Sequence, residues 1–239
     1  MANHKQSLVL VPGLMCSDSL FSPQLTGLAD VAEISIGRVI GNDAIEGMAQ
    51  SVLRASPERF ALAGLSLGGY VAFEVLRQAP ERVTRLALLN TNARADRPEQ
   101  IKQREILVGL GRTLGVRAVQ ALLFPFLVHK SRLGDLEFRE RLLKMAEWVG
   151  RPAFERQQSA IIARADNRAF LAEIKCPTLI VVGAQDNLTP VKVAEEMHQG
   201  IRGSRLEIIP ECGHLSTLEQ PEMVNAALRN WLAGSCSDV

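Results

Sequence analysis

A single serine stands among three glycines where two hydrophobic patterns meet. In the stretch LAGLSLGGYVAF (62–73), Ser66 has Gly64 two positions before it and Gly68 and Gly69 shortly after it. An apolar run typical of a buried strand leads into Ser66, and a helical pattern leads out. Small residues at these positions let a strand and a helix approach closely around a sharp turn that exposes the hydroxyl. The pattern predicts a nucleophilic serine beside a helix N-terminus, which stabilises a developing anion.

The glycine-rich turn has one alternative interpretation. It could bind a phosphate group through its backbone N–H groups. The phosphate-loop pattern G-x-x-x-x-G-K-[ST] is absent, however, and no lysine follows Gly68. We therefore favour the nucleophile.

A serine nucleophile needs a base, and the base needs a carboxylate that orients it. The chain has four histidines, of which only His214 stands in a loop directly after a predicted strand, LEIIP. Asp186 stands in the equivalent loop after the preceding predicted strand, in VVGAQD. We therefore predict Ser66, Asp186 and His214 as the catalytic residues. Alternatively, His214 could only stabilise its loop and Asp186 only a turn, and Asp96 is the alternative acid.

These three residues depend on a sheet to bring them together. Short apolar runs bounded by Gly, Pro or Asn are typical of strands buried on both faces of a parallel sheet. They occur at 7–11, 60–64, 86–90, 178–182 and 206–210. The run 31–37 alternates between apolar and polar residues, which favours a strand nearer an edge.

Helical patterns lie between the predicted strands, at 43–55, 67–79, 190–200 and 221–233. Thr189 and Pro190 are predicted to begin the third of these helices as its N-cap and first residue. The fold class is therefore α/β, with an open, mostly parallel sheet of about six strands and helices on both faces. Such sheets place their sites beyond the C-terminal ends of the strands.

The alternation of strands and helices is interrupted once, at about residues 95–172. This stretch has helical periodicity and no candidate strand, and it carries five more positive than negative charges. We predict a single domain over residues 1–239 with this stretch as a helical cap insertion. Its charge could attract anionic substrates or only form a solvated basic face. Phe124, Phe126 and Trp148 could line a substrate pocket, or they could pack the insertion against itself.

The motifs GLSLGG, GAQD and CGH, with LVLVPGLMCS near the N-terminus, resemble those of the α/β-hydrolase family over nearly the whole chain. The resemblance implies the α/β-hydrolase fold and a triad of Ser66, Asp186 and His214. It also implies that the backbone N–H groups of Leu14 and Leu67 form the oxyanion hole. Met15, next to Leu14, is a further candidate substrate-binding residue.

The chain departs from the family pattern in two places. Pro12-Gly13 stands where the family usually carries His-Gly, so the histidine that normally braces this loop is missing. The two leading antiparallel strands that are common in the family also have no counterpart, because the first predicted strand begins at residue 7. About six parallel strands are then expected.

Among members of the family, the compact form resembles small carboxylesterases, including those that act on pimeloyl-type methyl esters. We expect a serine hydrolase that cleaves a carboxylic ester of a small or medium acyl group, with no metal and no organic cofactor. The same residues serve thioesterases, lactonases, acyltransferases, carbon–carbon bond hydrolases and haloperoxidases. A catalytically silent receptor or scaffold with this fold is the alternative from another functional class.

The composition limits the partners. A net charge of +1 gives no sign of nucleic-acid binding, and the apolar runs are far shorter than the roughly 20 residues that span a bilayer. We expect a cytoplasmic monomer or homodimer with a small-molecule ester as substrate and no membrane contact. The cysteines have neither metal-ligand spacing nor the density of a disulfide scaffold, so reduced thiols are predicted; they are Cys16, Cys176, Cys212 and Cys236.

Overall fold

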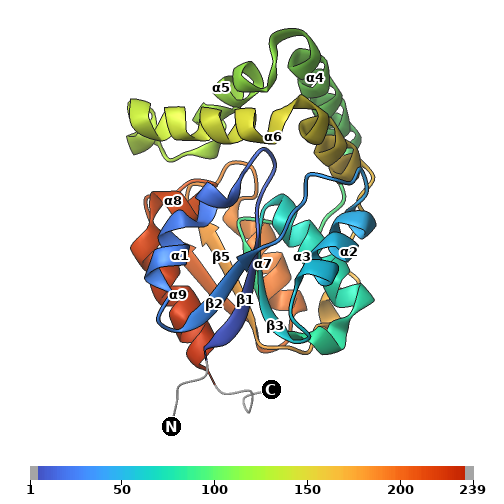
Figure 1. Cartoon of the computed structure of the whole chain (residues 1–239), viewed down its shortest axis with the longest axis vertical. Helices are drawn as coiled ribbons and strands as arrows, with labels where there is room; N and C mark the ends of the chain where they lie inside the picture. The colour runs from blue at the N-terminus through green and yellow to red at the C-terminus, as the bar shows by residue number, and fades with distance from the viewer. Residues whose placement is uncertain (1–4, 235–239) are drawn as a thin grey trace.

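A six-stranded parallel sheet forms the centre of the molecule (Figure 1). The computed structural model describes residues 5–234. The order across the sheet is β2-β1-β3-β4-β5-β6, and every neighbouring pair is parallel. The predicted fold class is therefore confirmed. The strands are β1 (Gln6–Val11), β2 (Ala32–Ile36), β3 (Phe60–Leu65), β4 (Val83–Leu89), β5 (Thr178–Gly183) and β6 (Arg205–Ile209).

Alternating side chains of the strands supply one core on each face of the sheet. On one face, Leu8 and Leu10 of β1 pack in a cluster with Leu228. On the other face, Val9 of β1 packs in a cluster with Val71. Because both faces are buried, the central strands read as continuous apolar runs, which made them recognisable in the sequence.

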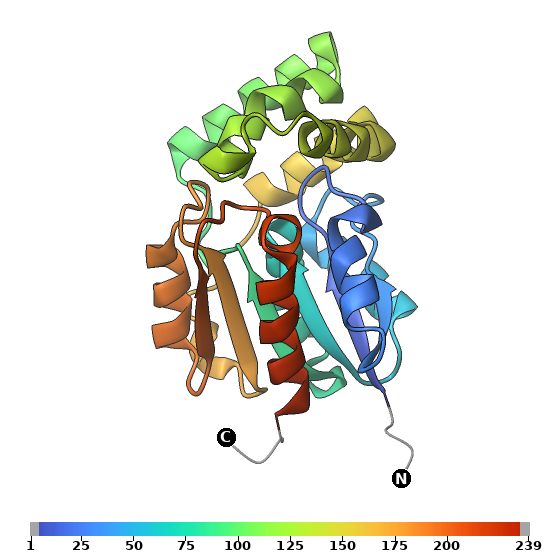
Figure 2. The same cartoon turned by 90° about the vertical axis from the view of Figure 1, so that its left-hand side faces the viewer.

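Two groups of helices cover these faces. The cluster around Leu8 and Leu10 is covered by α1 (Ser22–Gly27), α8 (Ser216–Glu219) and α9 (Pro221–Ala233), and Figure 2 shows α9 lying along this face. The cluster around Val9 is covered by α2 (Ile45–Ala55), α3 (Leu67–Gln78) and α7 (Val191–Gly200). Short 3-10 helices join other elements: η1 (Asp18–Phe21), η2 (Pro80–Arg82), η3 (Lys130–Arg132) and η4 (Leu171–Glu173).

The two edges of the sheet differ in how well the sequence predicted them. β2 is an edge strand, as its alternating pattern indicates. β6 is the other edge strand, and Ile208 on it is 45% exposed, so the expectation that this run is buried on both faces was wrong. An edge strand has only one neighbouring strand, and the helices leave part of β6 exposed to solvent.

Three further helices lie over the C-terminal ends of the strands (Figure 1). They are α4 (Pro98–Leu114), α5 (Val116–Leu127) and α6 (Leu136–Ile162), and we call residues 98–162 the cap. α6 is interrupted at Gly150, whose φ of 75° lies in the left-handed region that glycine adopts most easily. Pro152 follows and cannot donate a backbone hydrogen bond to the preceding turn. The break lets the two halves of α6 run in different directions over the sheet.

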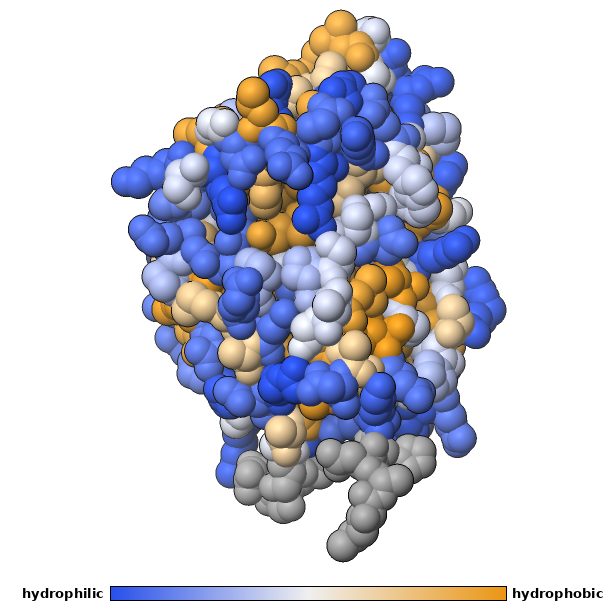
Figure 3. Space-filling model, turned by 60° about the vertical axis from the view of Figure 1, so that its left-hand side comes forward, coloured by the Kyte–Doolittle hydropathy of each residue, from blue (hydrophilic) through white to orange (hydrophobic). Residues whose placement is uncertain are grey.

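Apolar side chains are exposed mainly on the cap. Figure 3 shows apolar surface at the top of the molecule, where the cap lies, and a second apolar patch lower down on the same face. Within residues 5–234, no helix is both long enough and apolar enough to span a bilayer. The large apolar residues exposed on the cap are Ile106, Leu114, Leu122, Phe126, Leu133, Leu136 and Trp148.

Candidate active site

Ser66 occupies the sharp turn between β3 and α3. Its backbone has φ 55° and ψ −114°, a conformation that L-residues rarely adopt, and it directly precedes the first residue of α3. The surrounding strands hold this strained turn in place: the Ser66 N–H donates to the carbonyl of Leu89 at 3.0 Å, and the hydroxyl of Thr91 donates to the Ser66 carbonyl at 2.8 Å.

The glycines around Ser66 are required by close packing. A Cβ at Gly64 would lie 2.2 Å from the carbonyl oxygen of Gly68, and a Cβ at Gly68 would lie 2.0 Å from the carbonyl oxygen of Val11. Both distances are impossible for a methyl group. α3 can therefore begin beside β1 and β3 only because these positions carry no side chain.

Asp186 and His214 form a buried pair beside this turn. His214 Nδ1 lies 2.8 Å from Asp186 Oδ2, and the two residues are 3% exposed each. An ionised carboxylate can only accept hydrogen bonds, so Nδ1 carries the proton and Nε2 is left as a base.

Two polar residues that were not predicted complete the surroundings of Asp186. The Thr189 hydroxyl donates to Asp186 Oδ2 at 2.6 Å, and Asn90 Nδ2 donates to the same oxygen at 2.9 Å. Oδ1 accepts from the backbone N–H groups of Leu188 and Thr189, both at 2.9 Å. The position of Asn90 at the end of β4 was the one sequence signal that could have identified it.

The electrostatic balance at Asp186 favours the ionised carboxylate. Burial alone would raise its pKa, but the charge of His214 and the hydrogen bonds from His214 and Thr189 outweigh burial and lower the pKa to about 2. Asp186 is therefore a permanent anion that can orient an imidazole and stabilise its positive charge.

The carboxylate of Glu219 holds the loop that carries His214. Its Oε1 accepts from the backbone N–H groups of both neighbours of His214, at 3.1 Å each, and its Oε2 accepts from the His129 N–H at 2.6 Å. The His214 N–H donates to the carbonyl of Leu127 at 2.9 Å. The His214 loop is thus fixed to the segment of the cap that follows α5.

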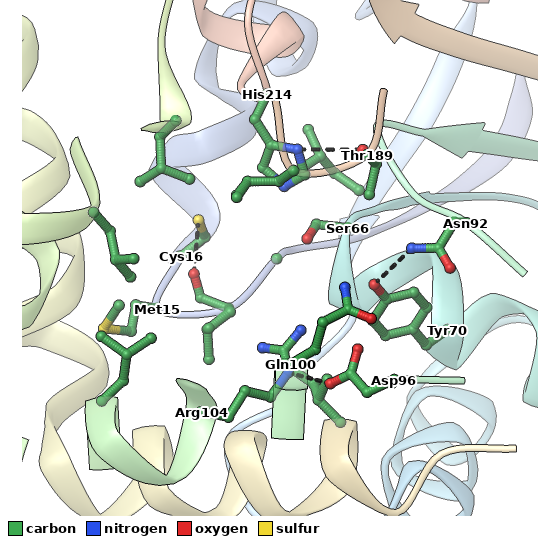
Figure 4. A pocket seen from close by; sticks show the side chains of 18 of the residues that line it. Met15, Cys16, Ser66, Tyr70, Asn92, Asp96, Gln100, Arg104, Thr189 and His214 are labelled. Carbon is green, nitrogen blue, oxygen red and sulfur yellow. Dashed lines mark hydrogen bonds and ion pairs between the residues drawn. The ribbon is translucent and has the colours of Figure 1, made fainter. Parts of the chain in front are cut away.

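A cavity of about 200 Å³ joins these groups under the cap. Ser66, His214, Met15 and Thr189 all line it, and Figure 4 shows the Ser66 hydroxyl between His214 and the cap side chains. No hydrogen bond of the described residues joins Ser66 to His214. Such catalytic bonds are often long before substrate binds and tighten with it.

The loop between β1 and η1, residues 12–17, forms one wall of the cavity, and we call it the Leu14 loop. Among the hydrogen bonds of the described residues, none uses the backbone N–H of Leu14 or of Leu67. Gln157 of α6 is fully buried, accepts from the Met15 N–H at 3.1 Å and donates to the carbonyl of Val39 at 3.2 Å. This contact, which was not predicted, braces the loop where the family's usual histidine is replaced by Pro12.

The predicted aromatic pocket residues lie elsewhere. Phe126 and Trp148 are 57% and 60% exposed on the cap, and Phe124 is buried in the cluster that also contains Leu8. None of the three is among the described residues that line the cavity with Ser66. Apolar periodicity predicts that such residues lie on a helix, but it does not predict which face of that helix lines the cavity. Met15 does line the cavity.

Asp96, the alternative acid, also lines the cavity but has other partners. It pairs with Arg104 and with Arg164, the latter at 2.8 Å. His214 Nδ1 is bonded to Asp186 instead. The geometry therefore favours Asp186 as the orienting carboxylate.

The described cysteines are free thiols. Cys16 and Cys212 are buried, and burial raises the pKa of Cys16 to about 12. Cys176 is partly buried and also unpaired, whereas the prediction for Cys236 lies outside the described residues. Over residues 5–234, no three His, Cys, Asp or Glu side chains are grouped to hold a metal ion.

Comparison with known proteins gives independent evidence on the fold and the family of this chain. RutD of Shigella flexneri, which is named as a carbamate hydrolase, is 30% identical over 244 residues that cover 95% of this chain and 91% of RutD. A thermophilic esterase from Thermogutta terrifontis, solved with malate bound, has a TM-score of 0.87 and 28% identity and covers 95% of this chain and 89% of its own. An enol-lactonase from Burkholderia xenovorans has a TM-score of 0.86 at 22% identity, with 97% and 92% covered, and shows a shared fold alone.

A family model of the alpha/beta hydrolase fold matches residues 43–221. The match begins just before α2 and ends at the first residue of α9, so it includes Ser66, Asp186, His214 and the cap. It spans most of the sequence, and RutD aligns over nearly the whole of both chains. On this extent of similarity, the chain belongs to the α/β-hydrolase family.

Proposed function

We propose that the protein is a serine hydrolase that cleaves a carboxylic ester of a small or medium acyl group through an acyl-enzyme. The observation that carries the proposal is the shared cavity of Ser66 and His214, in which the strained Ser66 turn faces an imidazole whose Nδ1 is bonded to the buried Asp186. A nucleophile, a base and an orienting carboxylate in this arrangement suit acyl transfer.

In the first half of the proposed reaction, His214 Nε2 takes the proton of the Ser66 hydroxyl while Oγ attacks the acyl carbon. The negative charge that develops on the carbonyl oxygen is stabilised by the backbone N–H groups of Leu14 and Leu67, which have no partner among the described residues. The N-terminus of α3 adds a favourable dipole at the same place. His214 then gives its proton to the departing alcohol.

In the second half, water attacks the acyl-enzyme. His214 takes a proton from the water and returns it to Ser66 Oγ as the acid leaves. Asp186 stays ionised throughout and stabilises the imidazolium that forms in each half. The proposed chemistry uses only groups of this chain and requires no metal and no organic cofactor.

The size of the cavity limits the substrate. A volume of about 200 Å³ lies below the roughly 300 to 1,000 Å³ of pockets for drug-sized ligands, which favours a short acyl group and a short alcohol.

A cytoplasmic location and a monomeric or dimeric state stay predictions from the sequence.

Carbamate hydrolysis is the second candidate function. RutD, 30% identical over nearly the whole chain, is named as a carbamate hydrolase. A carbamate offers the same kind of carbonyl carbon to Ser66, with nitrogen in place of the carbon that flanks the carbonyl of an ester. The same triad could therefore act on it.

Turnover and labelling would test the proposal. We expect hydrolysis of p-nitrophenyl acetate and butyrate and covalent labelling of Ser66 by a fluorophosphonate probe, both abolished in a folded Ser66→Ala variant. Faster turnover of a p-nitrophenyl carbamate than of the matched ester would favour the second candidate. A protein that neither reacts with the probe nor turns over any of these compounds would be the catalytically silent alternative.

A further inference from the structure

The cavity has a charged end that the proposed mechanism does not use. In Figure 4, His214 and Arg104 lie at opposite ends of the cavity, with Ser66 between them. At the Arg104 end, Arg164 Nη2 lies 2.8 Å from Asp96 Oδ1, and Arg104 Nε pairs with Asp96 Oδ2. All three charged residues line the cavity.

This cluster has two cations for one anion. Burial would raise the pKa of Asp96, but Arg164 and Arg104 outweigh burial and lower it, so the carboxylate is ionised. The other two nitrogens of Arg164 also have protein partners, since Nε donates to the carbonyl of Arg94 and Nη1 to that of Ile161. Two guanidinium groups share one carboxylate, so the cluster keeps a net positive charge. Arg104 is the more accessible of the two cations, since its side chain is 21% exposed and that of Arg164 is 3% exposed.

The polar groups near Arg104 have donors left over. The hydrogen bonds of Arg104 use Nε and Nη1, and none among the described residues uses Nη2. Gln100 Oε1 accepts from the Arg97 N–H at 3.0 Å, which leaves its Nε2 as a donor. The Tyr70 oxygen accepts from Asn92 at 3.2 Å, which leaves its O–H as a donor. This end of the cavity is suited to a group that only accepts hydrogen bonds.

We propose that the substrate carries a carboxylate, remote from the scissile bond, which Arg104 binds. An ionised carboxylate accepts hydrogen bonds without donating any, and its charge balances the net positive charge of the cluster. The proposal rests on the proposed function, because it places the carboxylate relative to Ser66 as the nucleophile. The small cavity restricts the substrate to a half-ester of a short dicarboxylic acid or an acyl ester of a short hydroxy acid.

Matched substrate pairs would test the site. Monomethyl glutarate and methyl glutaramate differ only in a carboxylate against a carboxamide, and 3-acetoxypropionate and its amide place the same difference in the alcohol half. We expect the acid to exceed the amide in kcat/KM by about 30-fold or more in at least one pair. Arg104→Gln should remove that preference, chiefly by raising KM for the acid. Arg104→Lys keeps a cation beside Asp96 and should retain part of the preference.

Arg112 provides the matched control. It lies on the cap and pairs with Glu155 at 3.2 Å, away from the cavity, so Arg112→Gln removes the same charge from the cap. The preference should persist in this variant. An equal loss in both variants would assign the preference to the overall field of the cap and overturn a site at Arg104.

The wild-type protein alone can also overturn the inference. Equal kcat/KM values for acid and amide in both pairs, with p-nitrophenyl acetate hydrolysed normally, would exclude the carboxylate site and leave the proposed function standing. Failure of the fluorophosphonate probe to label Ser66, with no ester turned over, would instead remove the proposed function and the inference with it.

Discussion

Five hydrogen bonds converge on the carboxylate of Asp186, from His214, Asn90, Leu188 and Thr189, the last of which donates through both its N–H and its hydroxyl. In Asp186→Asn, one of the two oxygens becomes an NH₂ group that faces donors, and the imidazole loses the tautomer that leaves Nε2 as a base. We expect kcat for ester hydrolysis to fall by about 10³ to 10⁴. Steady-state kinetics with p-nitrophenyl acetate would measure the loss.

Asp96→Asn is the matched control for this variant. Asp96 makes its ion pairs with Arg104 and Arg164, and His214 is bonded to Asp186. The control should therefore keep most of its turnover of a neutral ester. If Asp96→Asn instead caused the larger loss, Asp96 would be the orienting carboxylate.

The same carboxylate should make the stability of the protein depend on pH in the acid range. Its pKa is lowered from an ordinary 3.8 to about 2 in the folded protein, so its contribution is present above pH 3.8 and is lost as the pH falls through about 2. The difference in free energy of unfolding between the wild-type protein and Asp186→Asn should shrink by about 2 kcal/mol over this window. Urea unfolding at pH 5 and near pH 2 would show it. A difference that does not change with pH would contradict the assignment.

At the scale of elements, the contact between β3 and α3 depends on Gly64. The methyl group of Gly64→Ala would lie 2.2 Å from a backbone oxygen that belongs to the first turn of α3. We expect a loss of at least about 1 to 3 kcal/mol in the free energy of unfolding, because backbone must move to relieve the overlap. The measurement is the urea midpoint. Gly41→Ala is the control, since its Cβ would have no neighbour within 4 Å.

The loop that carries His214 depends in the same way on Glu219. Glu219→Gln turns one acceptor oxygen into a donor, so at least one of three backbone N–H groups is left unpaired in a buried place. That costs about 1 to 3 kcal/mol. We expect kcat to fall about tenfold or more with a smaller change in KM, because the position of His214 is affected and the cavity is not. Glu222→Gln, on the exposed surface of α9, should leave both constants unchanged. Unchanged kinetics in Glu219→Gln would exclude this positioning role.

On the scale of the whole molecule, the cap is joined to the sheet at the Leu14 loop. Gln157→Leu would leave the Met15 N–H and the Val39 carbonyl without partners. We expect a lower kcat with a smaller effect on KM, because the neighbouring Leu14 amide would be less well positioned for an oxyanion. Arg156→Gln removes an adjacent link, from the guanidinium to the Ile40 carbonyl, without touching this loop. Equal effects of the two variants on kcat would show that Gln157 acts only by attaching the cap.

The sheet and the positions of Ser66, Asp186 and His214 were predictable from the sequence for one physical reason. Each residue follows a short run with the pattern of a strand, and parallel strands end at a common edge, so the order along the chain determines proximity in space. The roles of these residues stay predictions until variants are measured. The edge position of β6 was not predictable, since its apolar sequence does not reveal how far neighbouring helices cover it.

Side-chain partners across the sheet were not predictable in the same way. Thr189 has the sequence context of a helix N-cap, yet its hydroxyl donates to Asp186 and α7 begins at Val191 with no side-chain cap. The same holds for the cap. The hydrophobic periodicity of the sequence predicted that residues of the cap are helical, but the exposed position of Trp148 depends on how these helices pack together.

The links between the cap and the strand-end loops restrict how this chain could be recombined with its relatives. Replacing residues 98–162 by the cap of another family member would remove Gln157 from the Leu14 loop and His129 from Glu219. A working chimera would need an amide side chain facing Met15 and a backbone N–H facing Glu219. In this protein, a transplant made to change the substrate would therefore also alter the placement of the proposed base, His214, and of the Leu14 N–H proposed as an oxyanion donor.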